Sequence, residues 1–382
     1  MSSPAVLVIS PIASHPADQG NAARIKAEAE ELRRRGIAMD FFYYGMEGLS
    51  QDQFKAMSQY WRRFFFLKSL ALEPPSLPHA WGLDDWCPDH LCEQVAQVVA
   101  AHDYDAVIVN YVWMSKTFER LDGPLKILDT HDLFGGRNTI AERARLEPRW
   151  YFTTIEEENR GFARADVVIG IQERESTVIE NRHKGRTITV GHPMDPQFLL
   201  RTRPKPPPSF TFGYIGSGNP FNVASLKALD QAIAPSSDVD WALAGTITRG
   251  RLSLQSCPYQ MGLVDDLSDF YDHVACVLNP MIGGTGLKIK TIEALAYGKS
   301  IIGTLDAFEG IPARHPFHQL RTMRDMVDAM RHYKQSDVLQ QEMQQESYRL
   351  FASYMARVSQ EYDELARIIC GDGSPRFSVA AA

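Results

Sequence analysis

Short apolar runs alternate with segments of helical periodicity along most of the chain. The first run, "AVLVIS" at 5–10, is continuously apolar, as expected of a parallel strand that is buried on both faces. The segment 21–36 then repeats Ile25, Ala29 and Leu32 at helical spacing and ends at Gly36. Strands separated by helices predict an α/β fold with a doubly wound parallel sheet.

The alternation is interrupted once and then restarts. Between 201 and 210 the chain holds four prolines, a composition that suits a stiff linker. Strands are predicted before it at 5–10, 38–44, 105–111, 125–130, 165–171 and 186–191, and after it at 210–216, 239–245, 275–280 and 300–304. We therefore expect two Rossmann-like domains, at 1–200 and 210–336, a linker at 201–209, C-terminal helices at 337–370 that pack back on the first domain, and a disordered tail at 371–382.

Composition and charge narrow the classes of function. With 382 residues, 44% of them hydrophobic, the chain can form ordinary globular cores. A net charge of -7 argues against a general nucleic-acid binder. The five cysteines are odd in number and scattered without a CxxC pair, which indicates a reduced cytoplasmic protein without a zinc site. No signal-peptide pattern and no apolar stretch of about 20 residues occurs, so any membrane contact is expected to be peripheral, at the inner face.

A glycine-rich segment, "PMIGGTGLKIKTIEALAYGK" at 280–299, joins a predicted strand to a predicted helix at 287–297. Its glycines, Gly283, Gly284 and Gly286, allow backbone N–H groups to approach a ligand. Lys288 and Lys290 lie in the first helical turn, where the helix dipole favours negative charge, so a multiply charged anion such as a diphosphate would explain them. Glu293, one turn later, suits the hydroxyls of a ribose. In the alternative interpretation the glycines only form a turn, Lys290 pairs with Glu293, and Lys288 is solvated.

Two other loops also join a predicted strand to a predicted helix. In "YIGSGNPFN", Gly216 and Gly218 follow a predicted strand and Asn222 opens a predicted helix. In "SHPADQGNAAR", Gly20 and Asn21 lie between the first strand and helix, with His15 and Asp18 as weaker candidates. The alternative for both loops is a tight turn with a helix cap.

A third candidate cluster lies in "ILDTHDLFGGRN" at 127–138. His131, Asp132 and Arg137 come just beyond a predicted strand, at the edge where α/β sheets bind ligands. Histidine titrates near neutral pH and can orient or polarise a hydroxyl group. The alternative is that these are solvated loop residues.

The segment 59–75, "QYWRRFFFLKSLALEPP", combines aromatic and basic residues. Trp61 and Phe64 to Phe66 beside Arg62, Arg63 and Lys68 suit an interfacial helix among lipid headgroups. The alternative is core packing of the aromatic rings with solvated basic groups.

The segment 262–304 resembles the C-terminal signature of GT-B glycosyltransferases, especially glycosyltransferase family four. It holds a strand to Pro280, a glycine-rich loop and then "EALAYGK" before a strand. Similarity also extends to 213–229, 165–176, 190–199 and the first strand, loop and helix. The resemblance implies a GT-B fold, with two Rossmann-like domains facing a cleft, a nucleotide-sugar bound mainly by the second and an acceptor by the first.

The resemblance also implies roles for individual residues. Glu293 would bind the ribose, and Gly283 to Leu287, including Thr285, would offer backbone amides to the sugar and diphosphate. The first loop, with Gly20 and Asn21, would meet the donor phosphate, and His131 would face the donor sugar. Asp132, Arg137 and Trp61 would lie on the acceptor side.

The chain departs from the family at two places. Thr285 stands where the family has the first glutamate of a pair, which leaves the donor sugar open, and no arginine accompanies Gly216 and Gly218, so charge neutralisation falls on Lys288 and Lys290. The expected function is retaining, metal-independent transfer of a sugar from a nucleotide-sugar, without a cofactor, to a glycan or lipid-linked acceptor of the cell envelope. The alternatives are a GT-B sugar-nucleotide epimerase and a non-catalytic nucleotide-sugar binder.

Overall fold

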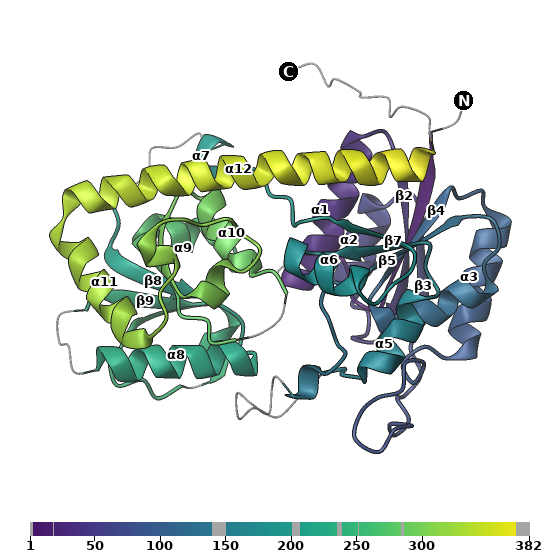
Figure 1. Ribbon diagram of the computed structural model, residues 1–382, viewed down its shortest axis with the longest axis horizontal. Helices are drawn as coiled ribbons and strands as arrows, with labels where there is room; N and C mark the ends of the chain where they lie inside the picture. The colour runs from purple at the N-terminus through teal and green to yellow at the C-terminus, as the bar shows by residue number, and fades with distance from the viewer. Residues whose placement is uncertain are drawn as a thin grey trace. The chain divides into compact units, whose positions relative to one another are not determined.

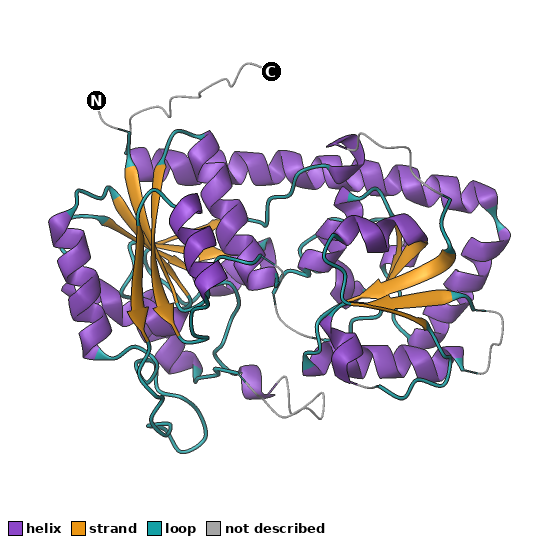
Figure 2. Cartoon of the chain, turned by 180° about the vertical axis from the view of Figure 1, so that it is seen from behind, coloured by secondary structure: helices purple, strands orange, loops and turns teal. Residues whose placement is uncertain are grey.

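The computed structural model describes residues 3–17, 19–139, 150–200, 207–234, 239–250, 252–283 and 286–371. The chain forms two compact units, Met1–Pro193 together with Arg357–Ala382, and Met194–Ala356. Each unit contains one parallel sheet flanked by helices (Figures 1 and 2). The predicted α/β class with two Rossmann-like sheets is therefore confirmed.

The first unit is built on a seven-stranded sheet in the order β3-β2-β1-β4-β5-β6-β7. Every pair of neighbouring strands in it is parallel. The order reverses between β1 and β4, the point where sheets of this kind leave a crevice at the carboxyl ends of their strands. The strands are β1 Ala5–Ser10, β2 Ala38–Gly45, β3 Phe64–Lys68, β4 Ala106–Asn110, β5 Leu125–Asp129, β6 Val167–Gly170 and β7 Arg186–Thr189.

The helices of the first unit connect these parallel strands. In the first of them, Ile25, Ala29 and Leu32 are buried as the sequence pattern predicts, and Gly36 follows its end with a φ of 81°. The helices are α1 Gly20–Arg34, α2 Gln51–Tyr60, α3 Asp89–Ala101, the 3₁₀ helix η1 Val112–Arg120, α5 Ile155–Phe162 and α6 Glu173–Glu180.

The aromatic and basic segment after residue 59 ends α2 and then forms the edge strand β3, so the hypothesis of an interfacial helix is wrong. Trp61 is 3% exposed and stacks on Phe41, with ring centroids 4.6 Å apart. Arg62 and Arg63 both donate to the buried carboxylate of Asp40. Arg62 and Arg63 therefore have an acidic partner within the unit. The segment pairs along β2 as a strand although its sequence shows no alternation of β-branched residues.

The second unit is built on a five-stranded parallel sheet in the order β10-β9-β8-β11-β12. Its strands are β8 Phe210–Ile215, β9 Trp241–Ala244, β10 Tyr259–Gly262, β11 Val274–Asn279 and β12 Ser300–Gly303. The sequence pattern did not predict the edge strand β10, because Tyr259 and Gln260 are exposed and give no buried apolar run. The helices are α7 Gln197–Leu200, α8 Pro220–Ile233, η2 Thr246–Gly250, α9 Leu267–His273, α10 Ile289–Ala296, η3 Leu305–Phe308, η4 Pro316–His318 and α11 Met323–Gln335.

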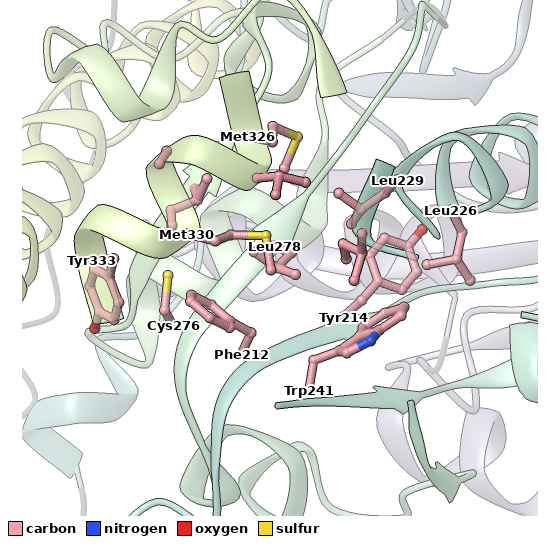
Figure 3. Packing of buried hydrophobic residues seen from close by; sticks show 14 of the residues in the cluster. Phe212, Tyr214, Leu226, Leu229, Trp241, Cys276, Leu278, Met326, Met330 and Tyr333 are labelled. Carbon is pink, nitrogen blue, oxygen red and sulfur yellow. The ribbon is translucent and has the colours of Figure 1, made fainter. Parts of the chain in front are cut away.

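The core of the second unit joins the sheet to α8 and α11. Figure 3 shows Met326 and Met330 of α11, Phe212 of β8 and Leu278 of β11 gathered in one cluster, with Tyr214 beside Leu226 and Leu229. The Tyr214 side chain is fully buried in this cluster, yet its hydroxyl reaches a polar neighbour described below. The Tyr214 ring is thus held in a close-packed apolar core, while its hydroxyl belongs to a polar site.

The last helix, α12 Asp337–Cys370, is 34 residues long. Its residues up to Ala356 belong to the second unit and those from Arg357 to the first. In the first unit, Arg35 donates to Asp363 and to the Ser359 carbonyl. Within the described residues, no helix has the length and apolar character that crossing a membrane requires. The proposed linker at 201–209 lies largely outside the described residues, as does the tail at 372–382.

Candidate functional site

The two lysines at the start of α10 occupy different positions. Lys288 is the residue before the helix, and its ammonium is buried, donating to the Gly286 carbonyl at 2.7 Å. The carboxylate of Glu309 lies 3.8 Å from the same ammonium. The hypothesis of a solvated Lys288 is therefore wrong, because the side chain turns back onto its own loop.

Lys290 is half-buried and lies in the first turn of α10. Its ammonium donates to Asn222 Oδ1 at 2.7 Å and to the Tyr214 hydroxyl at 3.2 Å, and it lies 4.9 Å from the centroid of the Tyr214 ring. These hydrogen-bond partners are neutral, so they position the ammonium without compensating its charge. Burial, together with the charge of Lys288, lowers the pKa of Lys290 to about 7, against the attraction of Glu293.

Asn222 links the two loops of this site. The sequence placed it as the residue that opens α8, but Asn219 is the cap, accepting from the Asn222 amide at 2.8 Å with Pro220 as the first helical residue. The Asn222 side chain is 5% exposed and donates to the Ser217 carbonyl at 3.0 Å, which directs its oxygen to Lys290. Asn222 therefore positions Lys290 and does not cap a helix.

Glu293 lies one turn after Lys290 and accepts from the Tyr271 hydroxyl at 2.6 Å. Tyr271 is fully buried in α9 and stacks on Tyr297, with ring centroids 4.2 Å apart. Burial raises the pKa of Glu293 to about 7, with the Tyr271 hydrogen bond and Lys290 acting in the opposite direction. Within the described residues, Lys290 and Glu293 form no ion pair, so the alternative of an ordinary surface pair is wrong.

Backbone amides of the glycine-rich loops donate hydrogen bonds within the protein, which the sequence does not predict. The Gly216 amide donates to the Ala244 carbonyl, the Gly218 amide to Thr246 Oγ1 at 3.3 Å, and the Gly283 amide to Asp306 Oδ2 at 2.7 Å. A side chain at Gly216 would meet its own neighbour Tyr214, and Gly283 has a φ of 68°. Gly216 and Gly283 are thus required for the chain path. These three amides already have acceptors, so they are not free donors to an anion.

The remaining residues of the glycine-rich segment are placed as follows. Leu287 is buried, and Gly286, with a φ of 73°, presents its carbonyl to Lys288. Gly284 and Thr285 lie outside the described residues, so the position that distinguishes this chain from family four has no structural account.

In the first unit, the site centres on His131, which follows the end of β5. His131 has a φ of 58°, and Tyr111, which follows β4, has a φ of 73° and a ψ of 137°. Their rings stack with centroids 4.3 Å apart. Backbone conformations that only glycine adopts easily are held at two neighbouring strand ends, a form of strain that is typical of functional sites.

The protonation of His131 follows from its surroundings. Burial, with the positive charge of Arg24, lowers the pKa of His131 to about 4 in spite of Asp129, so the ring is neutral near pH 7. Asn110 donates its amide to the Ile9 carbonyl at 3.3 Å, so its oxygen faces His131 Nε2, which must carry the proton. Nδ1 is then the acceptor of the ring. The expectation that His131 titrates near neutral pH is therefore wrong.

A buried ion pair supports His131 from behind. Arg24 of α1 is fully buried and donates two hydrogen bonds, at 2.8 and 3.1 Å, to the carboxylate of Asp129. Two further N–H groups of Arg24 donate to the carbonyls of Val190 and Gly191. Asp129 in turn accepts from the His131 amide at 3.3 Å. The pair thereby connects α1 and β5 to the strained residue.

The other candidates of the first unit divide between the site and its surroundings. Gly20 is the exposed first residue of α1, and the Asn21 side chain is near enough to the Tyr111 hydroxyl to oppose the rise that burial causes in the pKa of Tyr111, which places Asn21 beside this site. Asp132 and Arg137 pair with each other at 3.2 Å. Asp18 lies outside the described residues.

Trp61 does not present its ring to solvent, contrary to the expectation of an acceptor-side aromatic. It is buried, and its Nε1 donates to Ser14 Oγ at 2.9 Å. His15, next to Ser14, packs its ring 4.6 Å from the ring of Tyr60. These contacts tie the loop after β1 to the end of α2.

Several residues that complete the two sites were not predicted from the sequence. Tyr214 and Asn110 lie in apolar runs, which predict core positions for them. Tyr271 lies in the mixed segment "LSDFYDH", and Tyr111 gives no sign of a positive φ. For Tyr214 and Asn110, the available signal was a polar group on a residue within a predicted buried run.

Among the described residues, no three His, Cys, Asp or Glu side chains group as a metal site requires.

Comparison with known proteins rests on structure. No protein-family model and no curated protein sequence matches the chain. Sucrose-phosphate synthase from Thermosynechococcus elongatus is similar with a TM-score of 0.68 and 14% identity over 97% of this chain and 100% of that one. A glycosyltransferase from Rickettsia africae has a TM-score of 0.67 and 12% identity over 98% and 100%. HepE of Anabaena, solved with UDP and glucose, has a TM-score of 0.64 and 14% identity over 96% and 99%. The predicted GT-B fold is confirmed.

Proposed function

We propose that this protein is a glycosyltransferase that moves a sugar from a nucleotide-sugar donor to an acceptor hydroxyl. The observation that carries the proposal is the position of Lys290. Its ammonium is half-buried at the start of α10, between neutral partners, and has a lowered pKa. An anion bound here would gain a charge-assisted hydrogen bond and relieve the cost of the unpaired charge. Glu293, one helical turn away from Lys290, offers an acceptor for ribose hydroxyls.

The chemistry of the step follows from the same groups. In transfer from a nucleotide-sugar, negative charge develops on the departing diphosphate. Lys290, with Lys288 behind it, supplies positive charge where that phosphate leaves, so the residues act mainly by electrostatic stabilisation. We further propose retention of anomeric configuration without a metal, on the resemblance of 262–304 to family four. His131, neutral and with Nδ1 as acceptor, orients a sugar hydroxyl.

The donor and acceptor are proposed by chemical class. HepE was solved with UDP and glucose, so a uridine diphosphate sugar is the first donor to test. A glycan or a lipid-linked saccharide of the cell envelope is the proposed acceptor. Thr285, in the place of a glutamate of the family, is the position at which we expect the choice of donor sugar to differ.

The proposal is tested with a panel of UDP-, GDP-, ADP- and dTDP-sugars, with and without cell-envelope lipid extract. The measurement is the release of free nucleotide together with the labelled product. We expect release that depends on the acceptor, and its loss in Lys290→Met. Conversion of the donor without release would instead indicate an epimerase, and binding without either reaction would indicate a non-catalytic binder.

A matched variant makes the test specific to the site. Lys227 is an exposed lysine of α8 in the same unit, and the hydrogen bonds of the Lys290 ammonium go to Asn222 and Tyr214 instead. Lys227→Met should keep full nucleotide binding. If Lys290→Met binds nucleotide as tightly as Lys227→Met does, then the site proposed at the start of α10 is wrong.

A further inference from the structure

Two buried thiols lie together around the start of α3, and neither belongs to the two sites described above. Cys87 Sγ and Cys92 Sγ are 3.9 Å apart, and both side chains are at most 1% exposed. Both are free thiols. Oxidation to a disulfide requires the sulfurs to approach by about 2 Å, to the bond length of about 2.05 Å.

The surroundings make the two sulfurs different. Cys92 lies in the first turns of the 13-residue helix α3, where the helix dipole favours a thiolate. The Cys87 thiol hydrogen-bonds to Cys92, and with the charge of Lys116 this lowers the pKa of Cys92 despite its burial, while the pKa of Cys87 is raised. Lys116 is held nearby by Asp89, at 3.0 Å. Cys92 is therefore the attacking sulfur and Cys87 the partner that resolves the product.

We propose that Cys87 and Cys92 form a reversible disulfide, so that this pair is a redox-sensitive modification site in the first unit. The oxidant is a peroxide. The Cys92 thiolate attacks one peroxide oxygen, the O–O bond breaks, and a sulfenic acid and water are formed. Cys87 sulfur then attacks the sulfenic sulfur and displaces a second water. Two thiols lose two electrons and two protons, and the peroxide is reduced to two waters. A dithiol reductant reverses the change.

The pair is connected to the strained residue Tyr111. The single S–H of Cys87 has two acceptors within reach, Cys92 Sγ and the Met114 carbonyl at 3.7 Å, and the Met114 amide donates to the Tyr111 carbonyl at 3.1 Å. A disulfide removes the S–H donor at the first turn of η1. The oxidised protein is therefore expected to differ in the turn that follows Tyr111, the residue on which His131 stacks.

Burial determines which oxidants react. Cys257 is exposed and has no sulfur partner among the described residues, so it serves as an internal control. Hydrogen peroxide is much smaller than glutathione disulfide, so it needs a smaller opening of the fold to reach a buried thiol. We expect glutathione disulfide to modify Cys257 and to leave Cys87 and Cys92 unmodified.

The experiment is mass spectrometry of the native protein after brief treatment with hydrogen peroxide. Free thiols are alkylated after denaturation and the chain is digested with trypsin. No lysine or arginine lies between Lys68 and Lys116, so one peptide carries both cysteines. We expect this peptide about 2 Da lighter than its reduced form, without alkylation, and restored by dithiothreitol. Two alkylated thiols in this peptide, after a treatment that oxidises Cys257, would overturn the proposal.

Two comparisons test whether formation of the disulfide depends on the folded structure. In Cys92→Ser the bridge cannot form, and Cys87 should be recovered alkylated. If this variant does not fold, then the rate of bridging in the unaltered protein is compared with and without urea. The native rate is expected to be at least about tenfold higher, because the fold holds the sulfurs together. Equal rates in urea and in buffer would show that the pair is not organised by the structure and would also overturn the proposal.

Discussion

The imidazole of His131 lies against the ring of Tyr111, with centroids 4.3 Å apart and planes inclined by 25°. Both residues have a positive φ, and both follow the carboxyl ends of adjacent parallel strands, β4 and β5. The aromatic stack, the Asn110 oxygen and the Asp129 carboxylate together hold this conformation. The consequence is an imidazole fixed in one tautomer and one orientation, which is the arrangement a hydroxyl-orienting group requires.

The first prediction concerns His131. Replacing it with alanine removes the oriented Nδ1 acceptor but leaves the α10 site in the second unit unchanged. We expect His131→Ala to lower the turnover number by about 100-fold or more. Nucleotide affinity should stay as it is. The measurements are steady-state kinetics with the donor found in the panel above, and calorimetric titration with UDP.

An exposed histidine provides the control for this variant. His332 lies in the last turn of α11 with its side chain exposed, so His332→Ala should behave as the unaltered protein does. A drop in UDP affinity in His131→Ala equal to the drop in turnover would contradict the separate role proposed for His131.

The second prediction is the uptake of a proton when a nucleotide diphosphate binds. The pKa of Lys290 is about 7 in the free protein, so at pH 8 the amine is mostly neutral. A bound diphosphate favours the ammonium and raises this pKa, so binding must take up a proton. Affinity should accordingly fall as the pH rises above 7, by at most a factor of about 10 per pH unit for one proton. Calorimetry in buffers of different ionisation enthalpy measures the number of protons.

The origin of the proton is tested with substitutions at the same site. Lys290→Met should bind UDP more weakly and without the uptake, whereas Lys227→Met should retain both. Glu293 also has a pKa of about 7, so Glu293→Gln distinguishes its titration from that of Lys290. Uptake that persists in Lys290→Met would assign the proton to another group and contradict the prediction.

The third prediction concerns the positioning of Glu293. Tyr271 donates to Glu293 at 2.6 Å, and removing a hydrogen bond to a charged group costs about 1.5–3 kcal/mol. Tyr271→Phe should therefore weaken UDP binding by about tenfold or more, through Glu293 alone. The effect should be smaller for a diphosphate that lacks the ribose, because the Lys290 contact is retained. Titration with UDP and with pyrophosphate compares the two.

Tyr259 offers a matched control for this removal of a hydroxyl. It is an exposed tyrosine of β10 in the same unit, and Tyr259→Phe should leave both affinities unchanged. Equal losses for UDP and pyrophosphate in Tyr271→Phe would instead indicate that Tyr271 supports the fold of the whole site and not Glu293 in particular.

Much of the framework could be predicted from the sequence because parallel strands leave continuous apolar runs. β1 and β4 are buried along their whole length and were recognised for that reason. Edge strands could not be recognised this way, because β10 is half exposed and β3 consists of half-buried and exposed residues. Their pairing depends on neighbours that only the fold brings close.

The candidate site was predicted less completely, for a physical reason. Lys290 and Glu293 were found by their helical spacing and Lys288 by its place directly after the glycine-rich loop, and both of these signals are local. Their partners Tyr214, Asn222 and Tyr271 come from β8, α8 and α9, and no local pattern connects them. The lowered pKa of His131 depends likewise on burial among distant residues.

The last prediction concerns the buried pair of Arg24 and Asp129. Both side chains are at most 1% exposed, and Arg24 makes two hydrogen bonds to the carboxylate. Arg24→Met leaves a buried carboxylate without its counter-charge and should destabilise the first unit by about 3–5 kcal/mol. Arg331→Met, which breaks the exposed pair with Asp328, should cost no more than about 1 kcal/mol.

Urea denaturation followed by tryptophan fluorescence measures this effect selectively. Five of the six tryptophans lie in the first unit, at 61, 81, 86, 113 and 150, so the signal reports mainly on the unit that holds the pair. The double variant Arg24→Met with Asp129→Leu should recover much of the lost stability, because no charge is then left unpaired. If the double variant is as unstable as Arg24→Met, then packing of the arginine side chain, and not its charge, holds α1 against β5.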